Sequence, residues 1–484
     1  MNDNPEEKLR SVLAERAGSV RVDDPADRVT QRVTALRHRR RRRMALGSAA
    51  IAVVATAAAF VPVLAASRHD GKSASGSVKP TRAAVLASRL VRDTRPMVAP
   101  SAVAALTAAN TSTAIDLYHQ LATTPGNVFF SPYSIETALS MAAAGARGST
   151  LTQMLDVLHD RLPAATLQDA TNALNLSLLA PRPAPAGTGA GKALELELAN
   201  SVWSQTGYHI EPGFLDLLAR DYGAALNTVD YRDDTSGATK AINAWVDAHT
   251  NHKIKDLLSQ LDPATKLVLV NAVHFKGDWI VPFVPELTRN SSFTTAAGTK
   301  VSTPFMHGVM TARYASGSGW QAVDLPYVGD ASMTVIVPDA GTFASFDTNL
   351  DATRLARIIG SLSRAEIELA LPKFHLTDRS NLVPLLRALG MTRAFEDDAD
   401  FSGITGSRGL FIAQAVHQAT VTVDEKGTEA AAATGIAIAT SGITLRKSIA
   451  VDRPFIVVIR DTKTGSILFL GRITDPTQTD VHQP

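Results

Sequence analysis

Apolar residues recur along the chain with two different spacings, one typical of helices and the other typical of strands. A spacing of three to four residues predicts amphipathic helices at 114–122, 134–146, 151–158 and 237–258. Alternating or continuous apolar runs predict strands at 194–205, 266–277, 333–338, 366–376, 421–425, 454–461 and 467–473. Helices precede most of the strands, and the two types show little regular alternation. This order favours an α+β fold over a doubly wound parallel sheet.

The N-terminal part of the chain has a different pattern. Residues 1–43 are polar and are expected to be largely disordered and cytoplasmic. Residues 44–66 are apolar throughout and long enough for a transmembrane helix. Residues 67–104 begin with a Ser-, Gly- and Lys-rich stretch and are expected to be a flexible linker.

The arginine block before the apolar run sets its expected orientation. Arg37 and Arg39 to Arg43 favour a cytoplasmic N-terminus with the main domain outside the cytoplasm. An alternative is a cleaved export signal, with "VLAAS" as a small-residue cleavage site and the domain secreted. The long polar leader favours the anchor over the signal.

Composition excludes several kinds of function. The chain has 484 residues, a net charge of +2 and no cysteine, which rules out disulfides, thiolate metal sites and a cysteine nucleophile. The basic excess is concentrated in the arginine block, so we expect no nucleic-acid binding. No HExxH or GxSxG motif is present, and the histidines show no metal-like spacing. We therefore expect no enzymatic activity, no metal site and no cofactor.

One stretch, "DEKGTEAAAATGIAIATSGITLRKS" at 424–448, alternates in the manner of a strand. If Thr428 faces inward, the side chains on the same face are uncharged and include both isoleucines. These positions are Thr428, Ala430, Ala432, Thr434, Ile436, Ile438 and Thr440. Burying each isoleucine would stabilise such a strand by roughly 1.5–3 kcal/mol. A solvated linker has no need for this alternation.

Several segments, in this order and spacing, resemble the serpin family over roughly residues 105–478. They are "NVFFSPYSIETALSMAAAGARGSTLTQM" (127–154), "INAWVDAHTNHKIKDLL" (242–258), "LVLVNAVHFKGDWIVPF" (267–283), "LPKFHL" (371–376), "AFEDDADFSGIT" (394–405), "AVHQATVTVDEKGTEAAAATG" (415–435) and "RPFIVVIRDTKTGSILFLGRITDP" (453–476). Residues 479–484 are then a short C-terminal tail.

The resemblance implies a serpin fold with three β-sheets, about nine helices and an exposed reactive-centre loop. It implies a monomer that inhibits a serine protease: the protease cleaves the loop, is trapped as a covalent acyl-enzyme, and the loop inserts into the largest sheet. The alternative is a non-inhibitory serpin acting as a membrane-tethered binding or sensing module. Non-inhibitory relatives often carry proline or bulky charged residues in the hinge of this loop, and this chain has neither.

The resemblance also assigns roles to individual residues. The implied reactive bond is Ser441–Gly442, with Thr440–Ser441 as an alternative, and a small residue there suits an elastase- or subtilisin-like protease. Trp279 matches the breach, where the loop enters the sheet. The remaining matches are the hinge (Glu425, Gly427, Thr428, Ala430, Ala432 and Thr434) and the shutter beneath the opening sheet (Ser131, Ser134, Asn271 and His417).

Overall fold

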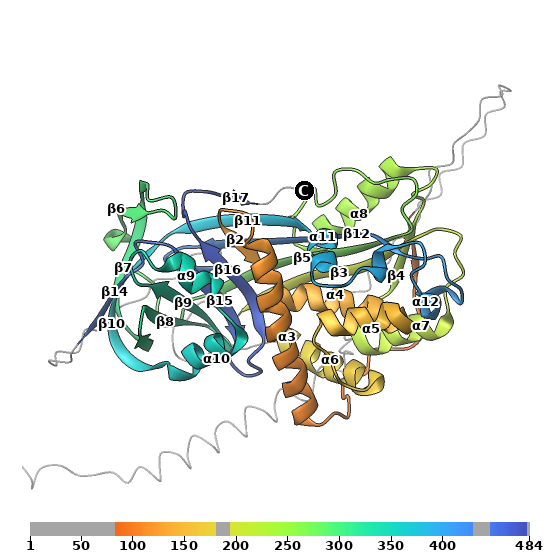
Figure 1. Ribbon diagram of the computed structural model, residues 1–484, viewed down its shortest axis with the longest axis horizontal. Helices are drawn as coiled ribbons and strands as arrows, with labels where there is room; N and C mark the ends of the chain where they lie inside the picture. Colours follow the sequence, from red (N-terminus) through yellow and green to blue (C-terminus); the bar gives the residue numbers. More distant parts are fainter. Residues whose placement is uncertain (1–82, 181–193, 429–445, 482–484) are drawn as a thin grey trace, which may run out of the picture. The chain divides into compact units, whose positions relative to one another are not determined.

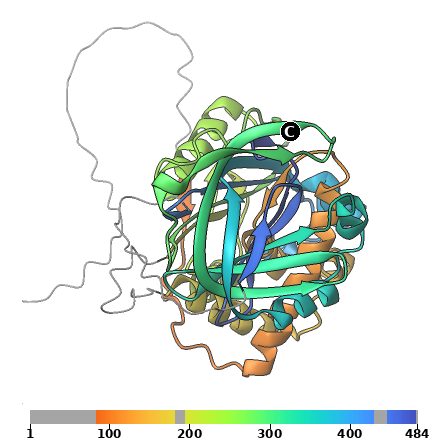
Figure 2. The same cartoon turned by 90° about the vertical axis from the view of Figure 1, so that its left-hand side faces the viewer.

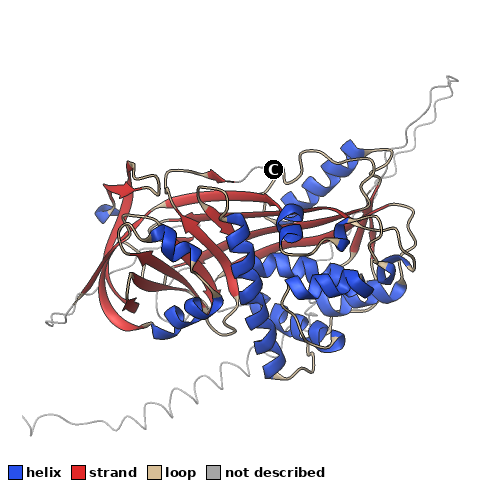
Figure 3. Ribbon diagram, viewed as in Figure 1, coloured by secondary structure: helices blue, strands red, loops and turns tan. Residues whose placement is uncertain are grey.

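The computed structural model describes residues 83–180, 194–428 and 446–481, all within one compact unit that spans Ser77–Pro484. The part of the chain that it describes contains ten α-helices, close to the nine expected (Figures 1 and 3). They are α3 (Pro100–Leu121), α4 (Pro132–Gly145), α5 (Gly148–Val157), α6 (Ala164–Leu179), α7 (Pro212–Leu217), α8 (Thr235–His249), α9 (Phe343–Thr348), α10 (Ala352–Ser361), α11 (Leu382–Ala388) and α12 (Ser402–Thr405).

Helix α4 shows how local sequence sets a boundary. The Ser131 side chain accepts a hydrogen bond from the Ser134 backbone N–H, and Pro132 stands at the first helical position, where no N–H is needed. The helix therefore begins two residues before the apolar spacing predicted. Helix α8 ends earlier than predicted, at His249. Asn251 and His252 have positive φ angles, which are incompatible with a right-handed helix.

One group of described strands forms an eight-stranded sheet with short strands at both edges. The order is β1 (Ala84–Leu86), β4 (Leu226–Val229), β3 (Glu195–Gln205), β5 (Leu267–Asp278), β13 (Gly427–Thr428), β12 (Ile412–Val423), β11 (Phe374–Asn381) and β17 (Asp480–Val481). Strands β5 and β12 also pair directly with each other, in parallel. Short strands from the two terminal regions thus cover backbone edges that would otherwise be open to pairing.

A nine-stranded sheet contains the other described strands. Its path is β14 (Lys447–Ala450), β10 (Ser363–Pro372), β7 (Lys300–Gly317), β8 (Trp320–Tyr327), β9 (Ala331–Pro338), β15 (Phe455–Asp461), β16 (Ile467–Ile473) and β2 (Val128–Phe130), and β6 (Arg289–Thr294) pairs with β7.

The expectation of three sheets is wrong for the described strands, which form two hydrogen-bonded sheets. The cause is the length of β7, which has 18 residues. Its first part pairs with β6 and its last part with β8, while β10 follows the other edge. One continuous strand therefore joins what would otherwise be two separate sheets.

The predicted strand at 366–376 is in fact two strands in different sheets. Strand β10 ends at Pro372 and β11 begins at Phe374, so the chain crosses between the sheets at Lys373. The Lys373 backbone N–H donates to the carbonyl of Pro304 at 2.9 Å, outside the pairing of either strand. The apolar pattern continues through the crossing because both strands are buried.

The predicted linker at 67–104 is too long at its C-terminal end. Its last part includes β1, which pairs with β4, and the first turn of α3. Pro100 at the first position of α3 starts this helix although the preceding residues lack an apolar period. Every helix in the described ranges is too short or too polar to span a bilayer. The predicted segment 44–66 lies outside those ranges.

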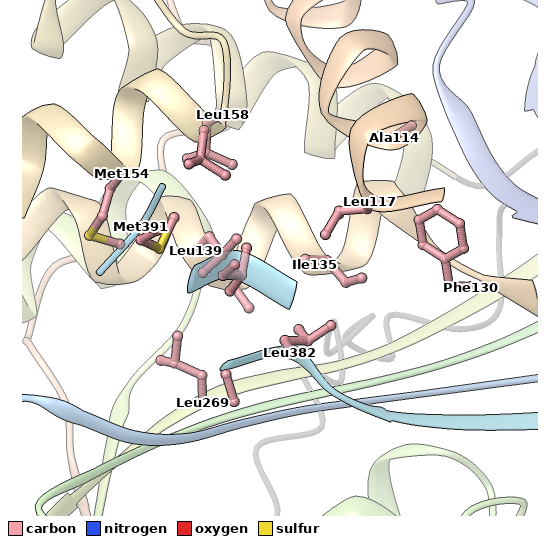
Figure 4. Packing of buried hydrophobic residues seen from close by; sticks show 14 of the residues in the cluster. Ala114, Leu117, Phe130, Ile135, Leu139, Met154, Leu158, Leu269, Leu382 and Met391 are labelled. Carbon is pink, nitrogen blue, oxygen red and sulfur yellow. The ribbon is translucent and has the colours of Figure 1, made fainter. Parts of the chain in front are cut away.

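Buried apolar side chains pack against both faces of the eight-stranded sheet. One face packs on α8 through Val268, Val270 and Ala272. The opposite face packs on the helices and on the nine-stranded sheet. Figure 4 shows part of this second layer, where Ile135 and Leu139 of α4 lie above Leu269 of β5. Strand β5 is therefore buried on both faces.

Gly471 provides a test of this close packing. A Cβ at this position in β16 would lie 2.3 Å from the carbonyl oxygen of Val128. Gly471→Ala should destabilise the fold by about 1–3 kcal/mol, because the backbone of β2 must shift. Thermal denaturation should show a Tm several degrees lower.

Gly360→Ala is the matched control, because no atom lies within 4 Å of the added Cβ in α10. This change should leave Tm unchanged or raise it, since alanine favours helix. Equal Tm values for the two variants would contradict the close packing of β2 on β16.

Candidate functional site

Strands β5 and β12 separate at one end, and the beginning of another strand lies between them. Lower in the sheet the two strands pair directly, from Leu267 with Ile412 to His274 with Thr420. Above His274, the two-residue strand β13 pairs with β5 through Gly427 and Thr428, and with β12 through Thr428. Strand β13 runs antiparallel to both neighbours. The site is therefore a partly filled gap between two strands that are closed further down.

Thr428 is fully buried at the leading end of this gap. Its hydroxyl shares a 2.7 Å hydrogen bond with the hydroxyl of Tyr327, on the nine-stranded sheet. The Tyr327 ring stacks on Trp279 with ring centroids 4.3 Å apart. The Trp279 indole N–H donates to the carbonyl of Asp424 at 3.0 Å. The stacked rings of Tyr327 and Trp279 thus lie beside the backbone of residues 424–428.

Glu425 anchors the turn that precedes β13. Its carboxylate forms a 2.8 Å ion pair with Lys373 and accepts a 2.7 Å hydrogen bond from Thr288. Burial alone would raise the pKa of Glu425, but the hydrogen bonds from Lys373 and Thr288 outweigh it and hold the pKa below its ordinary value. The carbonyl of Glu425 also accepts from the Phe283 N–H at 2.7 Å.

Gly427 is required by a close approach of two backbones. A Cβ here would lie 2.1 Å from the carbonyl oxygen of Gly277 on β5. The side chain of Asp424 accepts a 2.9 Å hydrogen bond from the Lys426 N–H and closes the turn. The chain therefore reverses from β12 into β13 within a few residues.

A buried polar cluster lies below the gap, where β5 and β12 pair. The four residues expected at the shutter all lie in this cluster. Asn271 donates to the Ser134 hydroxyl and to the Asn200 side-chain oxygen, each at 2.6 Å. His417 accepts a 3.0 Å hydrogen bond from the Ser131 N–H at Nε2 and contacts the Asn271 oxygen through Nδ1. The cluster links β5, β12, β3 and the N-terminus of α4.

These contacts fix the protonation state of His417. Since Nε2 accepts from a backbone N–H, Nδ1 must carry the proton and donate to Asn271. Burial lowers the pKa of His417 to about 3. The ring is therefore neutral near pH 7. A second proton would leave the Ser131 N–H without its acceptor and place an unpaired charge in the core.

Sequence reasoning missed three residues of this site. Asn200 completes the polar cluster from β3, Tyr327 contacts Thr428, and Lys373 pairs with Glu425. Each comes from an element far away in sequence, and no local pattern marks it. Ala430, Ala432, Thr434 and the expected reactive bond at Thr440, Ser441 and Gly442 lie outside the described residues.

The chain re-enters the described structure on the other side of the expected loop. Strand β14 pairs in parallel with β10, and Arg446 forms a 2.8 Å ion pair with Glu366. The loop therefore connects the eight-stranded sheet to the edge of the nine-stranded sheet. Within the described ranges, no three His, Asp or Glu side chains are grouped to hold a metal ion.

The neutral state of His417 predicts a pH dependence. An unfolded histidine titrates near pH 6.5, so between about pH 3 and 6.5 the unfolded chain binds a proton that the folded chain excludes. Stability should therefore fall as the pH drops through this window, by up to about 1.4 kcal/mol per pH unit. Thermal denaturation from pH 4 to 8 measures this slope.

The dependence of stability on pH should be weaker in His417→Gln, because glutamine at this position does not titrate. His375→Gln is the matched control, since His375 is an exposed histidine on β11, and it should retain the slope of the parent chain. An unchanged slope in His417→Gln would contradict the role assigned to the buried ring.

Comparison with known proteins identifies the family. The family model described as "Serpin (serine protease inhibitor)" matches residues 108–476. An uncharacterized serpin-like protein of Thermococcus kodakarensis is 38% identical, over 75% of this chain and 83% of its own length. The leukocyte elastase inhibitor of Bos taurus is 35% identical, over 77% of this chain and 99% of its own. The native-state crystal structure of the thermophilic serpin tengpin superposes with a TM-score of 0.73 at 27% identity, covering 81% of this chain and all of that one. The chain belongs to the serpin family.

Proposed function

We propose that this serpin inhibits a serine protease by insertion of its cleaved reactive loop between β5 and β12. The observation that carries the proposal is the position of Thr428, which already lies in the sheet between these strands. The gap is closed below it only by direct pairing of β5 with β12. Further insertion needs these two strands to separate.

The register of β13 predicts where each inserted residue would lie. Continued from Thr428 opposite Gly277, the same pairing places Thr434 opposite both Asn271 and His417. Insertion would therefore replace the direct contact between Asn271 and His417 with a threonine hydroxyl between them. Polar groups freed by the separation would keep a hydrogen-bonding partner.

The alternation of the loop fits this register. Residues opposite each other in neighbouring antiparallel strands point to the same face. Ile436 would lie opposite Leu269 and Ile438 opposite Leu267, on the face that packs against α4 and its neighbours. Burying each isoleucine contributes roughly 1.5–3 kcal/mol, and new backbone hydrogen bonds add to this. The inserted state would be the more stable one, which makes the intact form kinetically trapped.

The chemistry of inhibition begins as ordinary proteolysis. The serine hydroxyl of the protease attacks the carbonyl carbon of Ser441, and the amide bond to Gly442 breaks. The serine proton passes through the protease histidine to the departing amine of Gly442, and Ser441 remains as an ester on the protease. Insertion of the freed loop then carries the protease away before water hydrolyses the ester. Thr440–Ser441 is the alternative bond.

The small side chain of Ser441 favours an elastase- or subtilisin-like target, whose binding pocket tolerates small residues. Arg446 would suit a trypsin-like enzyme, but it pairs with Glu366 at the edge of the nine-stranded sheet. This position supports a structural role for Arg446.

The proposed location is the outer surface of a membrane. The apolar run at 44–66, preceded by the arginine block, supports an anchor with the serpin domain on the extracytoplasmic side. Secretion after signal cleavage is the alternative. A non-inhibitory sensing module is the second candidate function, and the small, proline-free hinge argues against it.

Incubation of the full chain with elastase-, subtilisin- and trypsin-like proteases tests the inhibitory function. We expect a covalent complex that survives SDS with at least one of the first two classes. Mass spectrometry of the released C-terminal fragment should place its first residue at Gly442 or Ser441. Cleavage of the loop with neither a complex nor a higher Tm would contradict the mechanism.

A charge at the leading end of the inserted strand tests the register. Thr428→Arg would place a guanidinium against Gly277 and Tyr327, where no acidic partner is described. Burying an unpaired charge costs several kcal/mol, so residue 428 should leave the sheet in the intact variant. Insertion of the cleaved loop must then bury this charge, so it should slow by about a hundredfold or more and the chain should become a substrate. The readout is the ratio of cleaved chain to covalent complex.

Glu429→Arg is the matched control for this variant. Residue 429 would occupy the opposite face of the inserted strand, so its charge should leave complex formation largely unchanged. Equal effects of the two substitutions would contradict the assignment of residues 428 and 429 to opposite faces of the inserted strand.

A further inference from the structure

Residues 83–99, here called the strap, are held firmly against the fold before α3 begins. Strand β1 pairs with β4, and Ser88 donates a 2.5 Å hydrogen bond to Asp216. The Arg92 guanidinium donates to the Asn172 side chain at 3.0 Å, and the Asp93 N–H donates to the Arg220 carbonyl at 2.9 Å. Figure 2 shows this segment in orange along the outside of the helices, leading into α3.

The strap presents apolar side chains to solvent although its backbone is fixed. Val85 is 64% exposed, Leu90 52%, Val91 85% and Met97 95%. Leu86 and Val98 are half-buried and pack against the core. Four of the most exposed large apolar residues in the described chain thus lie on one short segment, a concentration typical of an interaction surface.

Basic residues accompany this apolar surface. Arg89 and Arg95 are exposed on the strap, and neither has an acidic partner among the ion pairs of the described residues. The sequence adds Lys79 and Arg82 just before it. The strap carries one acidic residue, Asp93, which is half-buried. Apolar side chains beside arginines match the boundary between acyl chains and anionic headgroups.

The position of the strap in the chain indicates which surface it meets. Only residues 67–82 separate it from the apolar run at 44–66. A chain of this length spans at most about 55 Å when fully extended. If 44–66 lies in a bilayer, the strap stays within reach of that bilayer's surface.

We propose that the exposed side chains of the strap, Val85, Leu90, Val91 and Met97 with Arg89 and Arg95, contact the surface of a bilayer that contains anionic lipid. This inference rests on the membrane anchor proposed above for 44–66. The contact fixes the orientation of the domain on the membrane, because the strap is bonded to the fold at several points. The protein is then held on its membrane by a span and by a surface contact.

The absence of cysteine allows a direct test in the full chain. Met97→Cys is labelled with an environment-sensitive fluorophore, and the protein is reconstituted into vesicles of phosphatidylcholine with or without phosphatidylglycerol. We expect emission to shift to shorter wavelength, with severalfold stronger quenching by a lipid-borne quencher than for the same label at Lys300→Cys. Lys300 is exposed and belongs to the nine-stranded sheet. The effect should be larger with phosphatidylglycerol.

Two sets of substitutions separate surface contact from general hydrophobicity. Leu90→Ser with Val91→Ser should abolish most of the shift at position 97 without lowering Tm, because both side chains are exposed. Leu287→Ser with Val309→Ser, which alters exposed apolar residues outside the strap, should leave the shift unchanged.

Several results would overturn the inference, and they are distinguishable from failure of inhibition. An unshifted label on a chain that sediments with vesicles refutes the strap contact while leaving the anchor intact. A chain whose mass shows cleavage near residue 66, or that does not sediment, refutes the anchor and the strap contact together. A label already shifted without lipid means that the protein itself covers the strap. Complex formation with protease, measured in the same preparation, reports on inhibition independently.

Discussion

The direct pairing of β5 with β12 is the constraint on which the rest of this structure depends. It holds the eight-stranded sheet closed below Thr428, and it is supported by a buried contact between Asn271 and His417. The cluster around this contact draws on three strands and on the cap of α4. Strand β13 already begins at the upper end of this closed sheet, and its proposed extension requires β5 and β12 to separate.

The hinge is arranged so that this extension starts from a defined register. Glu425 is fixed by Lys373 and Thr288, and Gly427 permits the close approach to β5. Thr428 is buried beside the stacked rings of Tyr327 and Trp279. The following loop residues through Ile438 would then have a predetermined partner on both neighbouring strands. This connects a local feature, the turn at 424–427, to the positions of Ile436 and Ile438 in the inserted state.

The sequence predicted many of the strongly patterned elements, but it missed others, including α6, β7 and β8, and it did not show how the elements combine. Strand β16 has the predicted bounds, because its apolar run is short and clearly bounded. The prediction of three sheets was wrong because no pattern within β7 reveals that this strand pairs with both β6 and β8 along the same edge. The early start of the packed fold was missed because β1 is only three residues long and is stabilised by β4, far away in sequence. Tyr327 and Asn200 escaped for the same reason: their importance comes from contacts with distant strands.

A reversible clamp between β5 and β12 tests the central claim most directly. Ala272 and Gln418 are paired across the two strands, and the native chain has no cysteine. Neighbouring strands lie about 4.8 Å apart, which is within the range of Cα distances that a disulfide spans. In the doubly substituted Ala272→Cys, Gln418→Cys protein, the reduced form serves as its own control. After loop cleavage, the reduced form should gain a much higher Tm and form covalent complexes with a sensitive protease, whereas the oxidised form should do neither. Equal stabilisation of the oxidised and reduced forms would contradict insertion between these strands.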